Sequence, residues 1–244
     1  MLGPFDYGVA LLSFVAEVYV VVYLCISKYP VRYLALTIYM SAAVAATVCQ
    51  EIALRHFGLK SQVYGYAYYY TDALLTISLF FVIMSLYQQV FQQMGVGKYV
   101  RWASILLLSA TALFSYLVVR RMPTHHLTNR FVVEMGQNLY FVGVVLTYLL
   151  WGAIIKLRET RTRLIQLVLA VGIFFSADAA AYAMRHLFPG LQPAVLRFIP
   201  PVVGAFLPLA WAYTFTRISE EARLETARVS TRASIQHVAA HQHS

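Results

Sequence analysis

The stretch YAYYYTDALLTISLFFVIMSLY, Tyr66–Tyr87, decides the fold class. An α-helix needs about 20 apolar residues to cross the roughly 30 Å hydrocarbon core of a bilayer. This stretch has that length and carries one charged residue, Asp72, so it predicts a membrane-spanning helix. Six similar stretches fill most of the remaining chain. The expected spans are Phe5–Ile26, Tyr33–Leu54, Tyr66–Tyr87, Trp102–Val119, Phe131–Ile155, Leu164–Met184 and Leu196–Phe215.

The composition agrees with a lipid environment. The chain is 60% hydrophobic and 12% charged, with a mean hydropathy of +0.65, which is far from the average of soluble domains. Seven helices with short loops use nearly all of the 244 residues. We therefore expect an all-α, polytopic integral membrane protein of seven transmembrane helices over residues 1–217. Residues 218–244 form a polar cytoplasmic tail, in which Ser219–Glu225 is expected to continue the last helix.

The net charge of +9 is explained by membrane topology rather than by nucleic-acid binding, because most basic residues lie between spans. With the N-terminus outside, twelve Lys and Arg residues fall on inner segments and seven on outer ones. This bias predicts an N-out, C-in orientation. No basic segment precedes the first span, so we expect no cleavable signal peptide. The expected location is a bacterial cytoplasmic membrane.

Two similar helix ends predict an internal duplication. Ala53–Phe57, ALRHF, ends the second span, and Ala183–Leu187, AMRHL, ends the sixth. Arg32 and Arg163 likewise precede the second and sixth spans. Spans 1–3 would then correspond to spans 5–7, with span 4 as a connector, which is a 3+1+3 parallel repeat. A chance match of two helix ends is the alternative.

Three carboxylates lie within spans and have no basic residue within one helical turn, namely Glu17, Asp72 and Asp178. Charged groups in a bilayer are costly and mark functional sites. Because polar side chains recur near them at helical spacing, we expect these faces to line a polar cavity open to the outside. The candidate ligand-binding residues are Glu17, Tyr69, Asp72, Thr76, Asp178 and Tyr182. The alternative is a set of protonated carboxyl groups that hydrogen-bond to tyrosines and hold the helices together.

The other charged residues near the spans predict structural ion pairs. Glu51 and Arg55 are four residues apart, as are Arg130 and Glu134, which suits a local pair on a helix. Arg185 lies two turns from Asp178 and could reach a carboxylate on a neighbouring helix. Pro208 lies inside the last span, where proline kinks a helix, and is the candidate hinge.

Several chemistries have little support in the sequence. The spacing of His56, His125, His126 and His186 specifies no metal site, and Cys25 and Cys49 lie within spans, where a disulfide is not expected. We find no glycine-rich phosphate loop, HExxH motif or nucleophile elbow. We therefore predict no catalytic residue, no metal, no cofactor and no enzymatic activity. The tyrosines at the start of the third span suit an interfacial aromatic belt, with a box for a cationic ligand as the alternative.

Two short resemblances bear on function. The end of the last span, FLPLAWAYTFTR at Phe206–Arg217, resembles the last membrane helix of the seven-helix sensor modules of bacterial histidine kinases. That resemblance implies a sensing module that signals through a partner. Tyr70–Thr76, YTDALLT, is similar to helix three of microbial rhodopsins, which holds their counter-ion aspartate. The last span contains no lysine, however, so the usual covalent retinal Schiff base cannot form.

The leading functional hypothesis is a seven-helix membrane sensor or signal-coupling protein with an outward-facing polar pocket for a small or protonatable ligand. It would signal through a cytoplasmic or membrane partner that contacts the tail. The first alternative is a small-solute or proton-coupled transporter, and the second is a structural subunit of a membrane complex. Small-residue runs at Ser41–Ala46 and Ala177–Ala181 permit close helix contacts, within one chain or in a homo-oligomer.

Overall fold

The computed structural model describes residues 4–26, 32–58, 61–92, 97–120, 127–187 and 193–222. It is all-helical over these residues, and the seven helices lie where the sequence predicts them. Six of the described helices, α1 to α6, are long and apolar enough to cross a membrane, which indicates an integral membrane protein. The helices are α1 (Pro4–Ile26), α2 (Leu34–Phe57), α3 (Gln62–Val90), α4 (Gly97–Arg120), α5 (Leu127–Leu157), α6 (Thr162–Leu187) and α7 (Pro193–Arg217).

Large apolar side chains cover the outside of the bundle. Leu11, Leu106 and Ile155 are among many that are more than 60% exposed. A soluble protein of this size would carry polar side chains at such positions, because contiguous exposed apolar surface is rare in water. Helical hydrogen bonds satisfy most backbone polar groups within the helices, as lipid requires.

The turn between α2 and α3 shows how the chain reverses at one end of the bundle. Gly58 ends α2 with a φ of +76°, a conformation that suits glycine, and its N–H donates to the Leu54 carbonyl. Ser61 then caps α3, since its Oγ accepts a hydrogen bond of 3.1 Å from the Tyr64 N–H. This cap starts α3 four residues before the predicted span.

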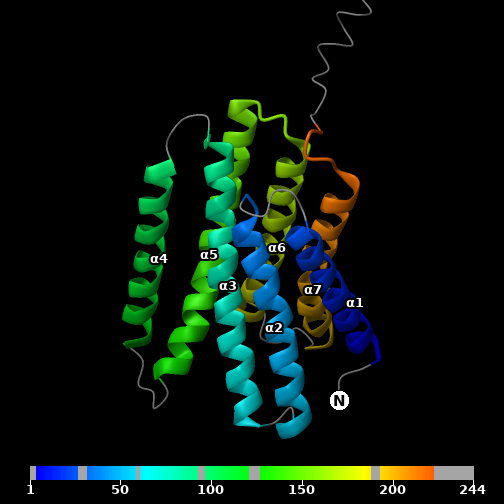
Figure 1. Ribbon diagram of the computed structural model, residues 1–244. Helices are drawn as coiled ribbons and strands as arrows, with labels where there is room; N and C mark the ends of the chain where they lie inside the picture. Colours follow the sequence, from blue (N-terminus) through cyan, green and yellow to red (C-terminus); the bar gives the residue numbers. More distant parts are fainter. Residues whose placement is uncertain are drawn as a thin grey trace, which may run out of the picture.

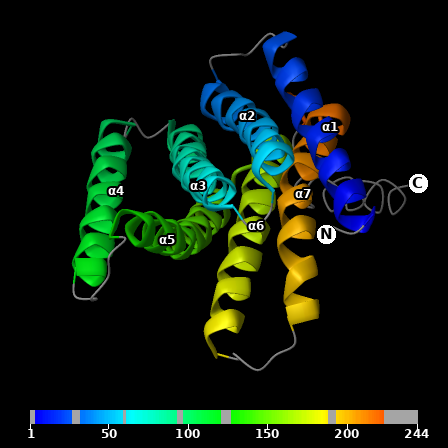
Figure 2. The same cartoon turned by 90° about the horizontal axis from the view of Figure 1, so that it is seen from below.

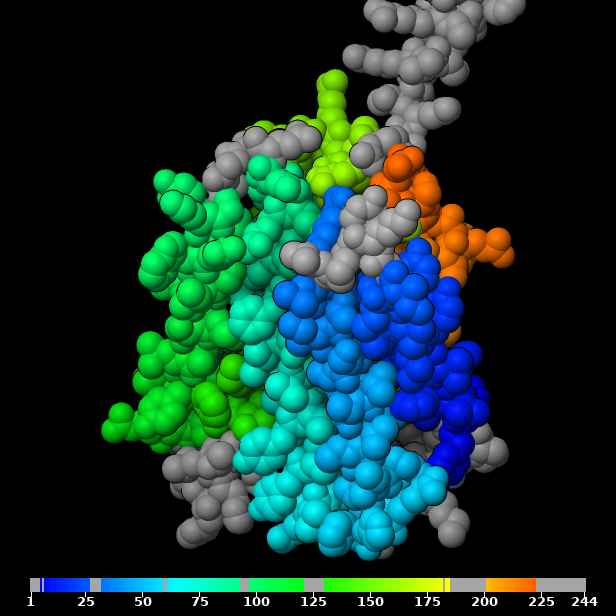
Figure 3. Space-filling model, in the orientation of Figure 1, coloured from blue at the N-terminus to red at the C-terminus, as the bar shows by residue number. Residues whose placement is uncertain are grey.

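Six of the seven helices form a closed ring. Going around it, the order is α1, α2, α3, α5, α6 and α7, and α7 packs against α1 to close it. Helix α4 stands outside the ring, where it contacts α5 and, along less of its length, α3. Figure 1 shows the helices from the side, and Figure 2 shows α4 at the edge of the bundle. In the space-filling view, α1 to α4 lie side by side across one face (Figure 3).

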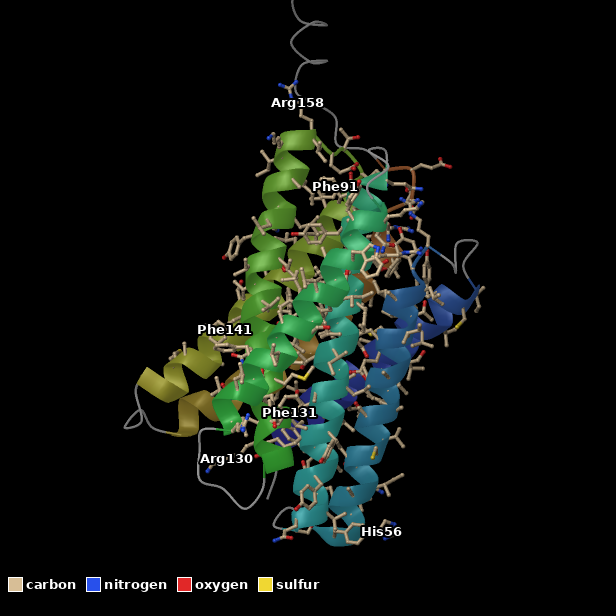
Figure 4. The ribbon with its side chains drawn as sticks, turned by 90° about the vertical axis from the view of Figure 1, so that its left-hand side faces the viewer. His56, Phe91, Arg130, Phe131, Phe141 and Arg158 are labelled. Carbon is tan, nitrogen blue, oxygen red and sulfur yellow. The ribbon has the colours of Figure 1, made fainter. Side chains whose placement is uncertain are left out.

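The two ends of the bundle are named here after residues labelled in Figure 4, which places Arg158 at one end and His56 at the other. The largest fully buried side chains concentrate in the half nearer the Arg158 end. They include Phe80 on α3, Leu167 on α6, and Trp211 and Phe215 on α7. The ring is therefore filled mainly by apolar side chains in this half.

Two glycines make room for side chains where α5 packs against α6. A Cβ atom on Gly143 of α5 would lie 2.4 Å from the ring of Phe175, and one on Gly172 of α6 would lie 2.6 Å from the Thr147 side chain. Small residues such as glycine permit this close packing between membrane helices.

The segment after α7 differs from the expectation. Helix α7 ends at Arg217, and Ile218–Ala222 form a bend and turn rather than the predicted continuation of the helix. The physical reason is tertiary: Ile218 and Glu220 are held by side chains from other helices, as described below. Residues 223–244, which hold the rest of the predicted tail, lie outside the described residues.

Candidate functional site: a carboxylate-lined cavity

The ring encloses a cavity of about 400 Å³ that is lined from all six of its helices. It lies in the half nearer the His56 end, on the side of the apolar core away from the Arg158 end. Three carboxylate residues line it, each from a different helix. The polar lining residues are Ser13, Glu17, Tyr39, Thr47, Gln50, Tyr68, Asp72, Thr76, Tyr140 and Asp178.

Hydroxyl groups hold two of the three carboxylates. The Ser13 Oγ donates to Glu17 Oε1 at 3.1 Å, and the Thr47 Oγ1 of α2 donates to Glu17 Oε2 at 3.5 Å. The Tyr140 hydroxyl of α5 donates to the Asp72 carboxylate of α3. The Thr47 and Tyr140 bonds connect neighbouring helices of the ring, α1 to α2 and α3 to α5, and both carboxylates line the cavity.

Tyr39 of α2 lines the cavity where it borders the apolar core. It is buried, and it is within electrostatic range of Glu17, Asp72 and Asp178. Its ring packs edge-on against Trp211, with 5.7 Å between centroids. Tyr39 therefore joins the carboxylate-lined cavity to the apolar core next to it.

The structure brings four of the six predicted ligand residues to this cavity, namely Glu17, Asp72, Thr76 and Asp178. Tyr69 is not among the lining residues and is 46% exposed. Its neighbour Tyr68, which is one full turn before Asp72, lines the cavity instead. The side chain of Tyr182 lies outside the described residues.

Sequence reasoning missed Tyr39, Thr47, Gln50 and Tyr140. They lie in spans whose carboxylates, Glu51 and Glu134, were assigned to local ion pairs rather than to the cavity. The lining residues of α2 could have been found from their spacing. They recur every three or four residues and so share one helix face, namely Tyr39, Ala43, Thr47 and Gln50. Gln50 also donates to Thr71 Oγ1 at 2.7 Å, which connects α2 to α3 near the His56 end.

Helix α7 carries the candidate hinge along the cavity wall. Pro201, Gly204, Ala205 and Pro208 all line it. Because proline has no N–H, the Gly204 carbonyl has no helical donor at position 208. A Cβ atom on Gly204 would meet nothing within 4 Å, so α7 is both weakened and loosely packed beside the cavity.

Glu220, just beyond α7, is held by two arginines at the Arg158 end. Its carboxylate lies 2.5 Å from Arg32 Nη1 and 2.8 Å from Arg163 Nη1, and it accepts a 2.7 Å hydrogen bond from the Tyr33 hydroxyl. Arg163 also donates to the Ile218 carbonyl from Nε, at 2.9 Å, and from Nη2. We call this set, Arg32, Tyr33, Arg163, Ile218 and Glu220, the Glu220 clamp. It ties the segment after α7 to α6 and to the start of α2.

A second polar group lies beside the clamp. Arg161 donates to both Glu159 oxygens, at 2.6 and 2.9 Å, and to the Gln89 carbonyl at 2.8 Å. Gln89 in turn bonds to Arg32. The hydrogen bond from the Arg161 side chain is the main reason that the pKa of Glu159 is lower than usual. Sequence spacing gave no indication of the clamp, because its partners are up to 188 positions apart.

The predicted local ion pairs have different outcomes. Arg55 Nε lies 2.6 Å from Glu51 Oε1 on the exposed end of α2, as the spacing indicates. Arg130 and Glu134 lie one turn apart near the start of α5, and their pairing stays a prediction. The Arg185 side chain lies outside the described residues. Among the described residues, no group of three or more His, Cys, Asp or Glu side chains could hold a metal ion.

Comparisons with known proteins give no match to a family model, to a curated protein or to a solved structure.

Proposed function

We propose that this protein is a seven-helix membrane sensor that binds a small organic cation in the carboxylate-lined cavity and passes the signal through α7 to the segment after it. The observation that carries this proposal is the course of α7. Four of its residues, from Pro201 to Pro208, line the cavity, and the chain directly after its end forms the Glu220 clamp. One element therefore touches both the candidate ligand site and the opposite end of the bundle.

The charge of the lining residues supports a cationic ligand. Three carboxylates face the cavity, and the described lining residues include no Lys, Arg or His. Carboxylates in a low-dielectric interior need a counter-ion or a proton. A protonated amine supplies the positive charge and can donate hydrogen bonds to the carboxylates. The aromatic side chains of Tyr39, Tyr68 and Tyr140 also line the cavity, and aromatic faces attract cations. The cavity volume suits a small molecule.

Transmission requires two states of α7 that bind the ligand with different affinity. The freed Gly204 carbonyl and the open space beside it allow α7 to bend near Pro208. A buried donor also lies one turn further on: Trp211 Nε1 has no hydrogen-bond partner among the described residues. A bend at Pro208 would move Trp211 and pull on Ile218, which Arg163 holds.

The test uses purified protein in detergent and a panel of small primary amines, diamines, quaternary ammonium compounds and uncharged alcohols of equal size. We expect at least one cation, and no alcohol, to raise the melting temperature. Asp72→Asn and Asp178→Asn should remove the response, whereas Glu51→Gln, at an exposed ion pair, should keep it. The proposal is wrong if no cation changes the melting temperature, or if both Asn variants respond like the wild type.

Movement of α7 can be read from Trp211. In a Trp102→Phe, Trp151→Phe background, Trp211 is the one remaining tryptophan, because the sequence holds three. Binding of an active amine should shift its emission. An unchanged emission spectrum at saturating amine would contradict coupling through α7, but it would not contradict binding of the amine in the cavity.

A proton-coupled transporter for small solutes is the second candidate. The arrangement of the six helices around the cavity favours it. The cavity lies between α1–α3 and α5–α7, and both sets line it, as in carriers built from two repeats. Arg32 and Arg163, which precede the second helix of each half of the proposed 3+1+3 repeat, both pair with Glu220. Uptake of a labelled amine into proteoliposomes separates the candidates: a sensor gives none, and a transporter gives uptake that falls in Asp72→Asn.

We also propose an N-out, C-in orientation in a bacterial cytoplasmic membrane, which puts the cavity on the outer side and the clamp on the inner side. The arginine and lysine bias supports this. Single cysteines at Phe57 and at Leu157, introduced into a variant lacking Cys25 and Cys49, test it. A membrane-impermeant maleimide added to intact cells should label only the first. Labelling of the cysteine at position 157 alone would show that the orientation is N-in, C-out.

A further inference from the structure

A second cavity, of about 350 Å³, lies outside the helix ring between α3, α4 and α5. It is separate from the carboxylate-lined cavity and shares no lining residue with it. All of its walls are apolar or aromatic side chains. The lining residues are Met84, Tyr87, Phe91, Tyr99, Val100, Ala103, Leu107, Leu146 and Leu149. We call this cavity the α3–α4–α5 groove.

The walls of the groove offer almost no hydrogen bonds to an occupant. The Tyr87 hydroxyl, in the wall, already donates to the Leu146 carbonyl at 2.6 Å. The rings of Tyr87 and Phe91 stack in parallel, with 6.1 Å between centroids, and form a smooth surface. The Tyr99 hydroxyl belongs to a side chain that is 77% exposed. An occupant must therefore present hydrocarbon to the walls, since an unpaired polar group would be costly there.

The groove lies toward the Arg158 end of the bundle, close to the edge of the membrane-spanning region. Phe91 directly follows α3, Tyr99 is in the first turn of α4, and Leu149 is about two turns before the end of α5. Figure 4 shows Phe91 near Arg158 and far from His56. At this depth in the bilayer, the groove faces the segments of phospholipid acyl chains that are nearest the headgroups.

Four basic residues lie close in sequence to groove residues at this end of the bundle. Lys98 and Arg101 lie in the first turns of α4, and Lys156 and Arg158 lie at the end of α5, and all four are exposed. Lys156 is seven residues after Leu149, so it lies on the same face of α5 as the groove wall. The nearest described acid along the chain, Glu159, is bound by Arg161. The electrostatic environment thus favours an anionic headgroup.

We propose that the α3–α4–α5 groove is a binding site for an anionic phospholipid of the bilayer, with one acyl chain in the groove and the phosphate at Lys98 and Lys156. The lipid fills the space between α3 and α4, because α4 stands outside the ring and contacts α3 along only part of its length. This site does not depend on the proposed function of the carboxylate-lined cavity. Its charge selectivity distinguishes it from the general lipid contact of the other exposed apolar faces.

The test counts lipids that stay bound to the purified protein in native mass spectrometry after exchange into phosphatidylglycerol or phosphatidylcholine of the same chain length. We expect the wild type to retain one phosphatidylglycerol and no phosphatidylcholine. Ala103→Trp places a large ring in the groove and should remove the retained lipid. Leu106→Trp is the matched control, because Leu106 is on the same helix, is 70% exposed and does not line the groove.

The headgroup contacts have their own variants, which leave the apolar walls intact. Lys156→Gln and Lys98→Gln should each weaken phosphatidylglycerol binding about fivefold, as expected for one basic residue at a membrane surface. Equal retention of both lipids by the wild type, or unchanged retention in Ala103→Trp, would overturn the proposal. Unchanged affinity in both lysine variants would overturn the placement of the phosphate.

Discussion

Arg163 and Arg55 show that two arginines of one membrane protein can differ greatly in what they contribute. Arg163 is 8% exposed and contacts Glu220, the Ile218 carbonyl and the ring of Phe215. The Arg55 side chain is 77% exposed and has one partner one turn away. Breaking a buried pair leaves a charge without a partner, whereas an exposed pair is replaced by water.

We predict that Arg163→Gln lowers the free energy of unfolding by about 2–3 kcal/mol, because Glu220 loses one of its two arginines and Ile218 loses its donors. Arg55→Gln should change it by less than about 0.5 kcal/mol. Unfolding in mixed detergent and SDS micelles, followed by circular dichroism, measures both. Equal effects of the two variants would contradict the structural role given to the clamp.

Glu159 gives the molecule an acid-sensitive contact. Its pKa is lowered in the folded protein by the hydrogen bond from Arg161. A lowered pKa contributes stability above the unfolded pKa of about 4.5, and this contribution is lost as the pH falls through the folded value. We predict that the stability difference between wild type and Glu159→Gln is constant from pH 7 to about pH 5 and shrinks at lower pH. Melting curves at each pH test this, and a difference that grows in acid would have the wrong sign.

At the scale of the helices, the contact of α5 with α6 depends on two glycines that have no room for a side chain. The Cβ of an alanine at 143 would overlap the fully buried ring of Phe175, which cannot move aside without disturbing the core. Gly152, on the same helix, has open space around its Cα. An alanine at position 143 therefore tests the effect of side-chain overlap on stability, and an alanine at position 152 tests the effect of helix propensity alone.

We predict that Gly143→Ala destabilises the protein by about 1–3 kcal/mol because of this overlap. Gly152→Ala should be neutral, or stabilise by up to about 1 kcal/mol, since alanine favours the helix over glycine. Both variants are measured by the same SDS unfolding. If Gly143→Ala were as stable as Gly152→Ala, the ring of Phe175 would not pack against Gly143.

The sequence predicted the helices well because membrane spans are local features. Each span needs only its own length and apolar composition, and Tyr66–Tyr87 already shows both. The pair Glu51 and Arg55 was also accessible, because its spacing is one helical turn. The expected helix over Ser219–Glu225 was wrong for Ser219–Ala222, because Arg163 and Arg32 bind the segment from positions far away in the chain. Local pattern carries no information about such partners.

For the cavity, the sequence identified the carboxylates and Thr76 but few of the other lining residues. Glu17, Asp72 and Asp178 stood out because charge is rare in a span. Tyr39 and Tyr140 did not, because tyrosine is common near membrane surfaces and its burial depends on the order of the helices around the ring. That order, with α4 outside, was not part of the sequence prediction.

At the scale of the whole molecule, the cavity and the clamp lie at opposite sides of the apolar core and are joined by α7. If a cation in the cavity loosens the clamp, then loosening the clamp must favour the cation by the same factor. We predict that Glu220→Gln raises the affinity for an active amine about fivefold, measured by titration of the melting temperature. Glu221→Gln, the neighbouring residue, is the control. An unchanged or weaker affinity in Glu220→Gln would show that the two ends are not coupled.

The position of α4 has a consequence for how the chain could be divided. Since α4 contributes no wall to the carboxylate-lined cavity, a break in the backbone beside it would leave both groups of three helices whole. Two separately synthesised fragments, one ending before Gly97 and one beginning there, could then associate in the bilayer and rebuild the complete cavity. In such a pair, the covalent link between the halves would be replaced by their mutual affinity, and assembly would become dependent on concentration.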